Sequence, residues 1–339
     1  MKTMLVIPDY LYGINNWELE RSYFKCFSNR AKSKEWRLVN IQDSISLNEI
    51  DCIFAPNYAK YLDKIHNFEI YDKIINKLKI PKILAIFETP SRRPDLWEST
   101  RWFDVCISFN KKPGKYCHCK HVENPYPYNF SENECIYKDW NSRNSMVWVA
   151  SNNWFQGFDS LSQRRLRDFD IFAKKLSGKI SIFGKGWDIK PDFLFGPLPI
   201  FGILQNKKNK IIYDNISKYF SGLIENKNKE ISGYKFCFSY ENTDNFPGYV
   251  TEKVFDAWMS GSIPIYRGER EFEETYNDLL ICPRLLGKKK TIEMMHKYND
   301  DDAYNMISKF QSMLIAGKFK NFSHEVFQDR ILDTANSLI

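Results

Sequence analysis

The stretch FCFSYENTDNFPGYVTEKVFDAWMSGSIPIYRG, residues 236–268, holds the pattern that decides the fold. An apolar run at 236–240 ends in a polar loop, a helical segment begins near Thr251 and closes at Gly261, and a second apolar run follows. A strand, a crossover helix and a second strand are typical of a parallel sheet. The helix also raises a question, because Lys253 stands in its first turn, where the backbone dipole is already positive.

Short apolar runs and helical segments alternate along the rest of the chain as well. We predict eight strands, at residues 4–8, 51–55, 83–87, 105–109, 146–150, 180–183, 236–240 and 263–266. The helical segment at residues 161–178 ends on Gly178, as helices commonly do. Near-continuous apolar strands separated by helices predict an α/β fold, with parallel sheets that helices cover on both faces.

The length of the chain and one loop-rich piece predict two domains. A chain of 339 residues can hold two cores, and residues 121–145 are rich in Pro, Asn and Ser with little periodicity. We therefore predict a first domain at 1–140, a second at 141–325 and a C-terminal helix at 326–339.

Composition narrows the class of protein and of ligand. Apolar runs are too short to span a bilayer, and the N-terminal run reads as a strand, not a signal peptide, so we expect a cytoplasmic protein. The net charge of +7 suits phosphate-bearing ligands or an anionic membrane surface. Lysines gather at 207–229 and 288–290 without regular aromatic spacing, which favours a solvated surface over nucleic-acid binding.

Cysteines and acidic residues provide no convincing metal site. The eight cysteines lie mostly in apolar runs, which predicts reduced, buried thiols. The cluster CHCKH, residues 117–121, crowds metal-ligating residue types, but no second pair stands at a zinc spacing, so a polar loop is favoured. The sequence NDDD at 299–302 is better explained as the N-cap of a helix.

A bound anion would explain Lys253. Backbone N–H groups at a helix start, joined by an ammonium, could hold a phosphate or diphosphate. The alternative is a solvated lysine on an exposed helix face. Ligands of doubly wound sheets bind outside the carboxyl ends of the strands, which makes the residues that follow the strands candidates. These are Glu88, Ser151, Asn152, Gly184, Glu241 and Asn242.

The string ENT…GYVTEKVFDAWMSGSIPIYRG resembles the donor-binding signature of the α1,3/4-fucosyltransferases, glycosyltransferase family 10. Further pieces resemble the family in the same order, namely IFETPS at 86–91, FDVCISF at 103–109, MVWVASNN at 146–153 and IFGKGW at 182–187. The family's Tyr-Arg after the second of these pieces is absent, and NKKPGKY stands there instead. The resemblance implies a GT-B architecture, in which two Rossmann-like domains face each other across a cleft and the second holds GDP-fucose.

The resemblance also implies the principal catalytic roles. Glu88 would be the base that takes the proton of the acceptor hydroxyl; alternatively it caps a turn or pairs with Arg92 or Arg93. Lys253 and an arginine would stabilise the departing diphosphate. Arg164 and Arg165 are the two candidates for that arginine, and Arg167 is a third. In the alternative interpretation these arginines form a basic helix face.

Other residues would complete the donor site. By analogy with the family, Glu252 and Tyr249 would contact the ribose or the sugar phosphate, and Asn242 and Glu241 would line the same pocket. Glu241 could instead be a structural cap. Gly184 would approach the base or ribose, or simply form a turn. No metal ion or other cofactor is expected, because no Asp-x-Asp stands between a strand and a helix.

The sequence therefore predicts an inverting glycosyltransferase. It would move L-fucose from GDP-fucose to a GlcNAc or glucose unit of an oligosaccharide or surface-glycan precursor, such as lipopolysaccharide or capsule, with peripheral contact to the inner face of the membrane. Two alternatives stay open: a transferase for another nucleotide-linked hexose or deoxyhexose, and a glycan-binding protein without catalysis.

Overall fold

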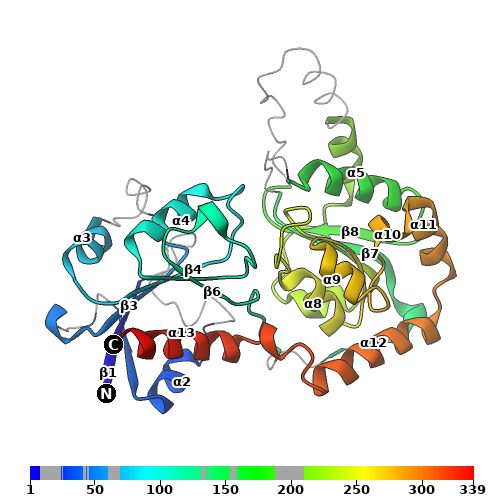
Figure 1. Cartoon of the computed structure of the whole chain (residues 1–339). Coiled ribbons are helices and arrows are strands. Elements are labelled where there is room, and N and C mark those ends of the chain that lie inside the picture. The colour runs from blue at the N-terminus through cyan, green and yellow to red at the C-terminus, as the bar shows by residue number, and fades with distance from the viewer. Residues whose placement is uncertain are drawn as a thin grey trace. The chain divides into compact units, whose positions relative to one another are not determined.

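The computed structural model describes residues 1–7, 24, 26–40, 43, 46–59, 69–130, 135–136, 138–152, 159–187 and 210–339. The chain forms two compact units (Figure 1). The first unit comprises residues 1–132, 247–249 and 319–339, and the second comprises 133–246 and 250–318. The division between residues 132 and 133 falls within the predicted linker, and the C-terminal helix belongs to the first unit.

The first unit contains a six-stranded, entirely parallel sheet in the order β2-β1-β3-β4-β5-β6. Its strands are β1 Lys2–Val6, β2 Trp36–Val39, β3 Cys52–Pro56, β4 Lys82–Ile86, β5 Val105–Ser108 and β6 Lys120–Glu123. The four strands predicted here are confirmed, except that residue 8 lies outside the described residues. We missed β2 and β6, and both are edge strands, whose partly exposed side chains do not form a continuous apolar run.

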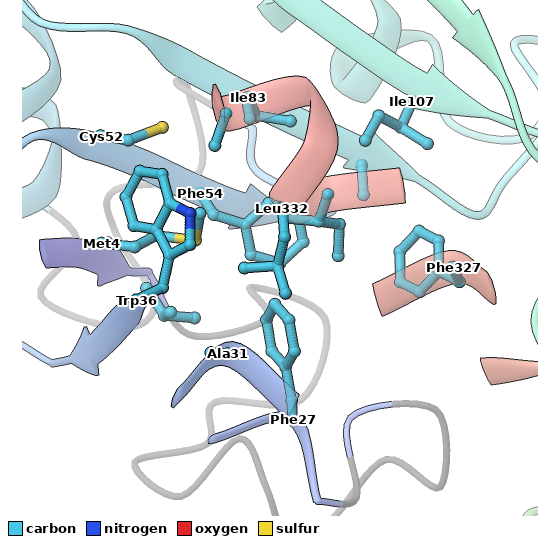
Figure 2. Close-up of a cluster of buried hydrophobic side chains, with 14 of the residues drawn as sticks. Met4, Phe27, Ala31, Trp36, Cys52, Phe54, Ile83, Ile107, Phe327 and Leu332 are labelled. Atoms are coloured by element: carbon cyan, nitrogen blue, oxygen red, sulfur yellow. The ribbon is translucent and has the colours of Figure 1, made fainter. Parts of the chain in front are cut away.

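Helices cover both faces of this first sheet. The elements are α2 Phe27–Ser33, η2 Leu47–Glu49, α3 Glu69–Lys77, α4 Pro94–Glu98, η3 Ser99–Trp102, η4 Gly114–Tyr116, η7 Lys320–Phe322 and α13 His324–Leu338. Strand residues alternate between two cores, as the pleat requires. Met4 and Phe54 face α2 and α13, where Phe27 and Leu332 complete one core (Figure 2). Residues of α3 and α4 complete the other.

The second unit contains a four-stranded parallel sheet in the order β10-β9-β7-β8. Its strands are β7 Asn144–Val149, β8 Ile180–Phe183, β9 Tyr234–Tyr240 and β10 Ile263–Arg267, and all four were predicted. Residues 210–216 are also helical. The named helices are η5 Trp140–Ser142, α5 Ser162–Ala173, η6 Ser217–Tyr219, α7 Lys227–Ile231, α8 Glu252–Met259, α9 Arg270–Thr275, α10 Pro283–Leu286, α11 Lys288–Lys297 and α12 Asp300–Ile315.

Aromatic packing fixes α5 on one face of the second sheet. The Phe169 ring of α5 lies 5.1 Å from Trp148 of β7 and 5.4 Å from Phe238 of β9. On the other face, α7 and α8 contribute to a core with β7, β8 and β9. Helix α5 ends at Ala173, five residues before the predicted Gly178, because the carbonyl of Phe172 already accepts two amides of a closing turn.

Local structure confirms two further predictions, on the NDDD segment and on four buried cysteines. Asn299 and Asp302 form a reciprocal capping box at the start of α12, so NDDD is an N-cap. Cys52, Cys106, Cys237 and Cys282 are free and buried. Among the helices within the described ranges, none combines the length and apolar character that crossing a bilayer requires.

Candidate functional site

The candidate donor-binding residues gather at one edge of the second sheet. Because all four strands are parallel, their carboxyl ends share this edge. Ser151 and Asn152 follow β7, Gly184 follows β8, and Glu241 and Asn242 follow β9. The predicted grouping at strand ends is therefore present in the structure.

Glu241 is the centre of a buried hydrogen-bond network. The residue is completely inaccessible to solvent. Its Oε1 accepts from the amide of Thr251 at 2.7 Å and from the hydroxyl of Tyr266 at 3.4 Å. Its Oε2 accepts from the Thr251 hydroxyl at 2.8 Å and from Lys253 Nζ at 3.2 Å. These contacts favour the alternative interpretation, in which Glu241 holds the start of α8 in place.

Protein carboxylates surround Lys253, which stands in the first turn of α8. Its ammonium donates to Thr251 Oγ1 at 2.7 Å and lies 3.5 Å from Glu252 Oε1, besides its bond to Glu241. Only 14% of its side chain is exposed. A solvated lysine on an exposed face is therefore wrong. Two acidic side chains offset the unfavourable helix dipole, and the lysine side chain stays partly accessible at the carboxyl edge of the sheet.

Arg165 is the arginine that the structure brings to the same strand end. Its Nη1 donates to Asn242 Oδ1 at 2.7 Å, and its guanidinium lies 5.1 Å from the centre of the Trp148 ring. Arg165 is 6% exposed, whereas Arg164 is half-buried and Arg167 is exposed. The basic-face interpretation therefore describes Arg167 but not Arg165.

One dipeptide thus holds two cations from two helices. Glu241 bonds Lys253 of α8, and the next residue, Asn242, bonds Arg165 of α5. A bidentate donor and a point charge at one strand end form an arrangement suited to phosphate groups.

The ends of β7 and β8 are joined by backbone and amide contacts. Asn152 Nδ2 donates to the carbonyl of Gly186 at 2.8 Å and to the Tyr213 hydroxyl at 3.2 Å. Gly184 has a φ of 138°, and a Cβ at this position would lie 2.2 Å from the carbonyl oxygen of Ala150. The close approach at Gly184 is therefore made to the protein's own backbone, and its contact with a ligand stays a prediction.

A small cavity lies between these strand ends and α5. Its volume is about 20 Å³, enough for one water molecule. The lining residues are Trp148, Ser151, Asn152, Ser162, Arg165, Leu166 and Trp187. Three of the predicted donor-binding residues (Ser151, Asn152 and Arg165) thus share one cavity.

Two lysines control the charge of Glu252. Burial raises the pKa of this carboxyl, but the positive charges of Lys253 and Lys227, with hydrogen bonds from its own amide and Thr251, lower it to about 2. Lys227 of α7 also forms an ion pair with Asp256 of α8. With 37% of its side chain exposed, Glu252 is an ionised and accessible acceptor of hydrogen bonds.

Tyr249 belongs to the first unit, although the chain around it belongs to the second. Its ring is 2% exposed and lies 5.0 Å from the ring of Phe109. The preceding Gly248 has a φ of 80°, and a Cβ there would lie 2.0 Å from the Phe109 carbonyl oxygen. This packing favours a structural role for Tyr249, and its contact with the donor stays a prediction.

Glu88 follows β4 in the first unit, as predicted. Its Oε2 lies 3.4 Å from Arg92 Nε, and its backbone carbonyl accepts from Trp97 Nε1 at 2.9 Å. Arg93 instead pairs with Asp95 at 2.6 Å. The alternative pairing with Arg92 is therefore present, and 18% of the Glu88 side chain is exposed. Its role as a base is not tested by these contacts.

Sequence reasoning missed several residues that shape the site. Thr251 is the N-cap of α8, yet its hydroxyl bonds the side chains of Glu241 and Lys253 instead of capping a backbone N–H of the helix. A Cβ on Gly268 would lie 2.4 Å from the Tyr266 hydroxyl oxygen, so this glycine allows the Glu241 network to close. Thr251 could have been found as the residue before an acidic helix start, whereas the other contacts join distant segments and leave no sequence signal.

The apolar spacing of α5 was a missed signal for Arg165. Residues 161, 165, 169 and 172 are all buried, and their separations of three and four place them on one helix face. This spacing puts Arg165, and neither Arg164 nor Arg167, on the face that packs against the sheet.

Comparison with known proteins gives matches in sequence and in structure. No protein-family model matches the chain. A segment of 54 residues is 46% identical to the alpha-(1,3)-fucosyltransferase FucT of Helicobacter pylori, and it covers 16% of this chain and 11% of that protein. A crystal structure of alpha1,3-fucosyltransferase matches with a TM-score of 0.53 at 16% identity. Another, with GDP, gives 0.51 at 15%, and each match covers 90% of this chain and 81% of the other.

These matches confirm the resemblance in local sequence and in fold. The chain is similar to α1,3-fucosyltransferases over a short segment of sequence and over most of its length in structure. The predicted fold class, a mixed α/β architecture of GT-B type with parallel sheets, is confirmed.

Proposed function

We propose that this chain is an inverting α-1,3-fucosyltransferase, which moves L-fucose from GDP-fucose to a GlcNAc or glucose unit of an oligosaccharide. The observation that carries the proposal is the pair of cations, Arg165 and Lys253, held by adjacent residues at the end of β9. The likeness to α1,3-fucosyltransferases, one of them with GDP, supports the choice of donor.

The two cations would act on the leaving group. As the bond between the sugar C1 and the phosphate oxygen breaks, negative charge grows on the diphosphate. The fixed charges of Arg165 and Lys253 stabilise that charge more in the transition state than in the bound donor. Because Glu241 and Asn242 hold both cations before the donor arrives, little reorganisation is required during the reaction.

Glu88 is proposed as the base. Its carboxylate would take the proton of the acceptor hydroxyl while the hydroxyl oxygen attacks C1 from the face opposite the phosphate, which inverts the anomeric configuration. Its proximity to Arg92 holds the carboxylate in one position. The acceptor would bind the first unit and the donor the second.

We also propose a role for Glu252, metal-independent transfer and a cellular location. Glu252, ionised and partly exposed, would accept hydrogen bonds from hydroxyl groups of the donor. We expect the reaction to need no metal ion, because Arg165 and Lys253 would stabilise the charge of the diphosphate. We further propose a cytoplasmic enzyme that acts on surface-glycan precursors, such as those of lipopolysaccharide or capsule, at the membrane.

A donor and acceptor screen tests this function. Purified protein is incubated with labelled GDP-fucose, GDP-mannose or UDP-galactose on a glycan array, with and without EDTA. We expect transfer from GDP-fucose alone, to GlcNAc- or glucose-containing glycans, with the rate unchanged by EDTA. Transfer from another nucleotide sugar would contradict the choice of donor, and loss of activity in EDTA that a divalent ion restores would contradict metal independence.

The variant Glu88→Gln tests the base, with Glu98→Gln as its matched control. Glu98 is an exposed carboxylate of the same unit, paired with Arg101. Loss of a general base reduces kcat by about 10²–10⁴-fold, while the affinity for GDP should stay within about twofold, since Glu88 is not a donor contact. If Glu88→Gln retained the activity of the control, Glu88 would not be the base.

A further inference from the structure

Three thiols lie together where the chain passes from β5 to β6. Cys106 is buried within β5, and Cys117 and Cys119 are half-buried in the connection that precedes β6. The sulfur atoms of Cys117 and Cys119 are 3.9 Å apart, and both residues pack against the buried core that contains Cys106. No group of three or more His, Cys, Asp or Glu side chains in the described ranges could hold a metal ion, so thiol chemistry is the use that this geometry supports.

The segment around these thiols is strongly basic. Residues 110–121 contain four lysines and two histidines and neither Asp nor Glu. The acidic groups that face the segment come from elsewhere: Glu98 lies 3.5 Å from His118, Asp104 acts on Cys119, and Glu123 acts on His121. Partly exposed thiols in electropositive surroundings are the reactive ones in proteins.

The contacts between the sulfur atoms distinguish Cys117 from its neighbours. The neighbouring Cys106 and Cys119 side chains, and then the Cys119 backbone and His121, lower the pKa of the Cys117 thiol against burial, which raises it. Burial raises the pKa of Cys106, and the hydrogen bond to Cys117 raises that of Cys119. Among the three sulfurs, Cys117 is therefore the one whose surroundings favour the thiolate.

We propose that Cys117 and Cys119 form a dithiol pair that hydrogen peroxide oxidises to a disulfide. The Cys117 thiolate attacks one peroxide oxygen, the O–O bond breaks, and a sulfenic acid and hydroxide form. The Cys119 sulfur then displaces hydroxide from the sulfenic acid, and the S–S bond forms as its proton leaves. The two sulfur atoms lose two electrons in total, the peroxide is reduced to two molecules of water, and two equivalents of an external thiol restore the dithiol.

Cys119 is the resolving partner because it lies outside the strands. Cys106 is paired within the sheet on both sides, with Leu84 of β4 and His121 of β6. Cys119 directly precedes β6. The residue before it, His118, donates its backbone N–H to Thr100 Oγ1 at 2.9 Å. The sulfur atoms must approach by about 2 Å to form a bond, and a connecting segment can move this far more easily than the interior of a strand.

Peroxide titration of the whole chain, followed by alkylation and peptide mass spectrometry, tests the proposal. Cys26 is an exposed thiol at the start of α2 and serves as an internal control. The thiolate is the reacting form, and a thiol whose pKa falls from about 8.5 to below 6 gains up to about 30-fold in thiolate at pH 7. Because nucleophilicity falls with pKa, we expect Cys117 to be oxidised about tenfold faster than Cys26. The product should be a Cys117–Cys119 disulfide that dithiothreitol reverses.

Two variants separate the roles of the two sulfurs. Cys117→Ser should abolish rapid oxidation of Cys119. Cys119→Ser should leave Cys117 reactive but stop at a sulfenic acid that dimedone traps. These readouts need no enzymatic activity, and the melting temperature of each variant reports its folding. Oxidation of Cys117 no faster than that of Cys26, or a Cys106–Cys117 disulfide as the product, would overturn the proposal.

Discussion

Replacing Glu241 by glutamine should expose how strongly the second unit depends on one buried carboxylate. The substitution keeps the size of the side chain but removes its charge and one acceptor. If the amide oxygen occupies the position of Oε1, the bonds from Thr251 and Tyr266 persist, and the new NH₂ group faces the ammonium of Lys253. A donor then lies beside a cation that has lost its buried partner.

The cost follows from the burial of this pair. Breaking a buried ion pair by removing one partner costs about 3–5 kcal/mol. Because Lys253 is 14% exposed and keeps its bond to Thr251, we expect the lower end of that range, about 3 kcal/mol. For a domain of this size, such a loss corresponds to a fall in Tm of about 6–12 °C.

Calorimetry at pH 7 measures the effect, with Glu274→Gln as the matched control. Glu274 forms an exposed pair with Arg270 on α9, and because solvent screens such a pair, its loss should have little effect on stability. The double variant Glu241→Gln/Lys253→Met should be more stable than the sum of the single variants predicts, by at least about 0.5 kcal/mol, since the two side chains are in contact. An effect of Glu241→Gln no larger than that of Glu274→Gln, or strict additivity, would refute this account.

Three further predictions concern the same edge of the sheet. Arg165→Lys removes the planar guanidinium that bonds Asn242 and lies over the Trp148 ring. Calorimetric titration should therefore show GDP binding weakened about 10- to 100-fold, whereas Arg164→Lys should change the affinity less than about twofold. Equal effects would contradict the choice of Arg165. In urea unfolding, Gly184→Ala should destabilise the chain about 1–3 kcal/mol more than Gly222→Ala does. Both glycines have a positive φ, but only at Gly184 would a Cβ meet backbone atoms. Equal losses of unfolding free energy would show that the φ angle alone is responsible. The folded pKa of Glu252, about 2, is below its ordinary value, so the stabilising effect of its charge should be present above about pH 4.5 and lost as the pH falls towards 2. The difference in Tm between the native chain and Glu252→Gln should therefore shrink from pH 7 to pH 3. A difference independent of pH would contradict this pKa.

Strands in the interior of both sheets were predictable because they are buried on both faces. The residues of β3 are all buried, and such a strand appears in the sequence as an unbroken apolar run. The edge strand β2 has the exposed Arg37 in its interior, and no residue of the edge strand β6 is buried. Their pairing depends on the neighbouring strand, which the local sequence does not show.

The C-terminal helix illustrates a second limit. Its amphipathic pattern predicted a helix, and α13 confirms it. Its place on the first sheet depends on contacts with residues about 300 positions earlier, such as the bond from Trp36 Nε1 to Asn336 Oδ1 at 3.2 Å and the pairing of Arg30 with Asp329. Helical periodicity identifies an apolar face but not the surface that the face will cover.

The amino-acid sequence alone predicts which residue types stand at the strand ends and places a lysine in the first turn of α8. These are local properties, set by periodicity, by helix boundaries and by the order of residues along the chain. The surroundings of these residues follow from the tertiary structure. Glu241 is a buried partner of Lys253, and of the three candidate arginines it is Arg165 that bonds Asn242. The physical reason is that burial and hydrogen-bond partners depend on how separate segments pack, and here a glycine at 268, beside Tyr266, leaves the space in which the Glu241 network closes.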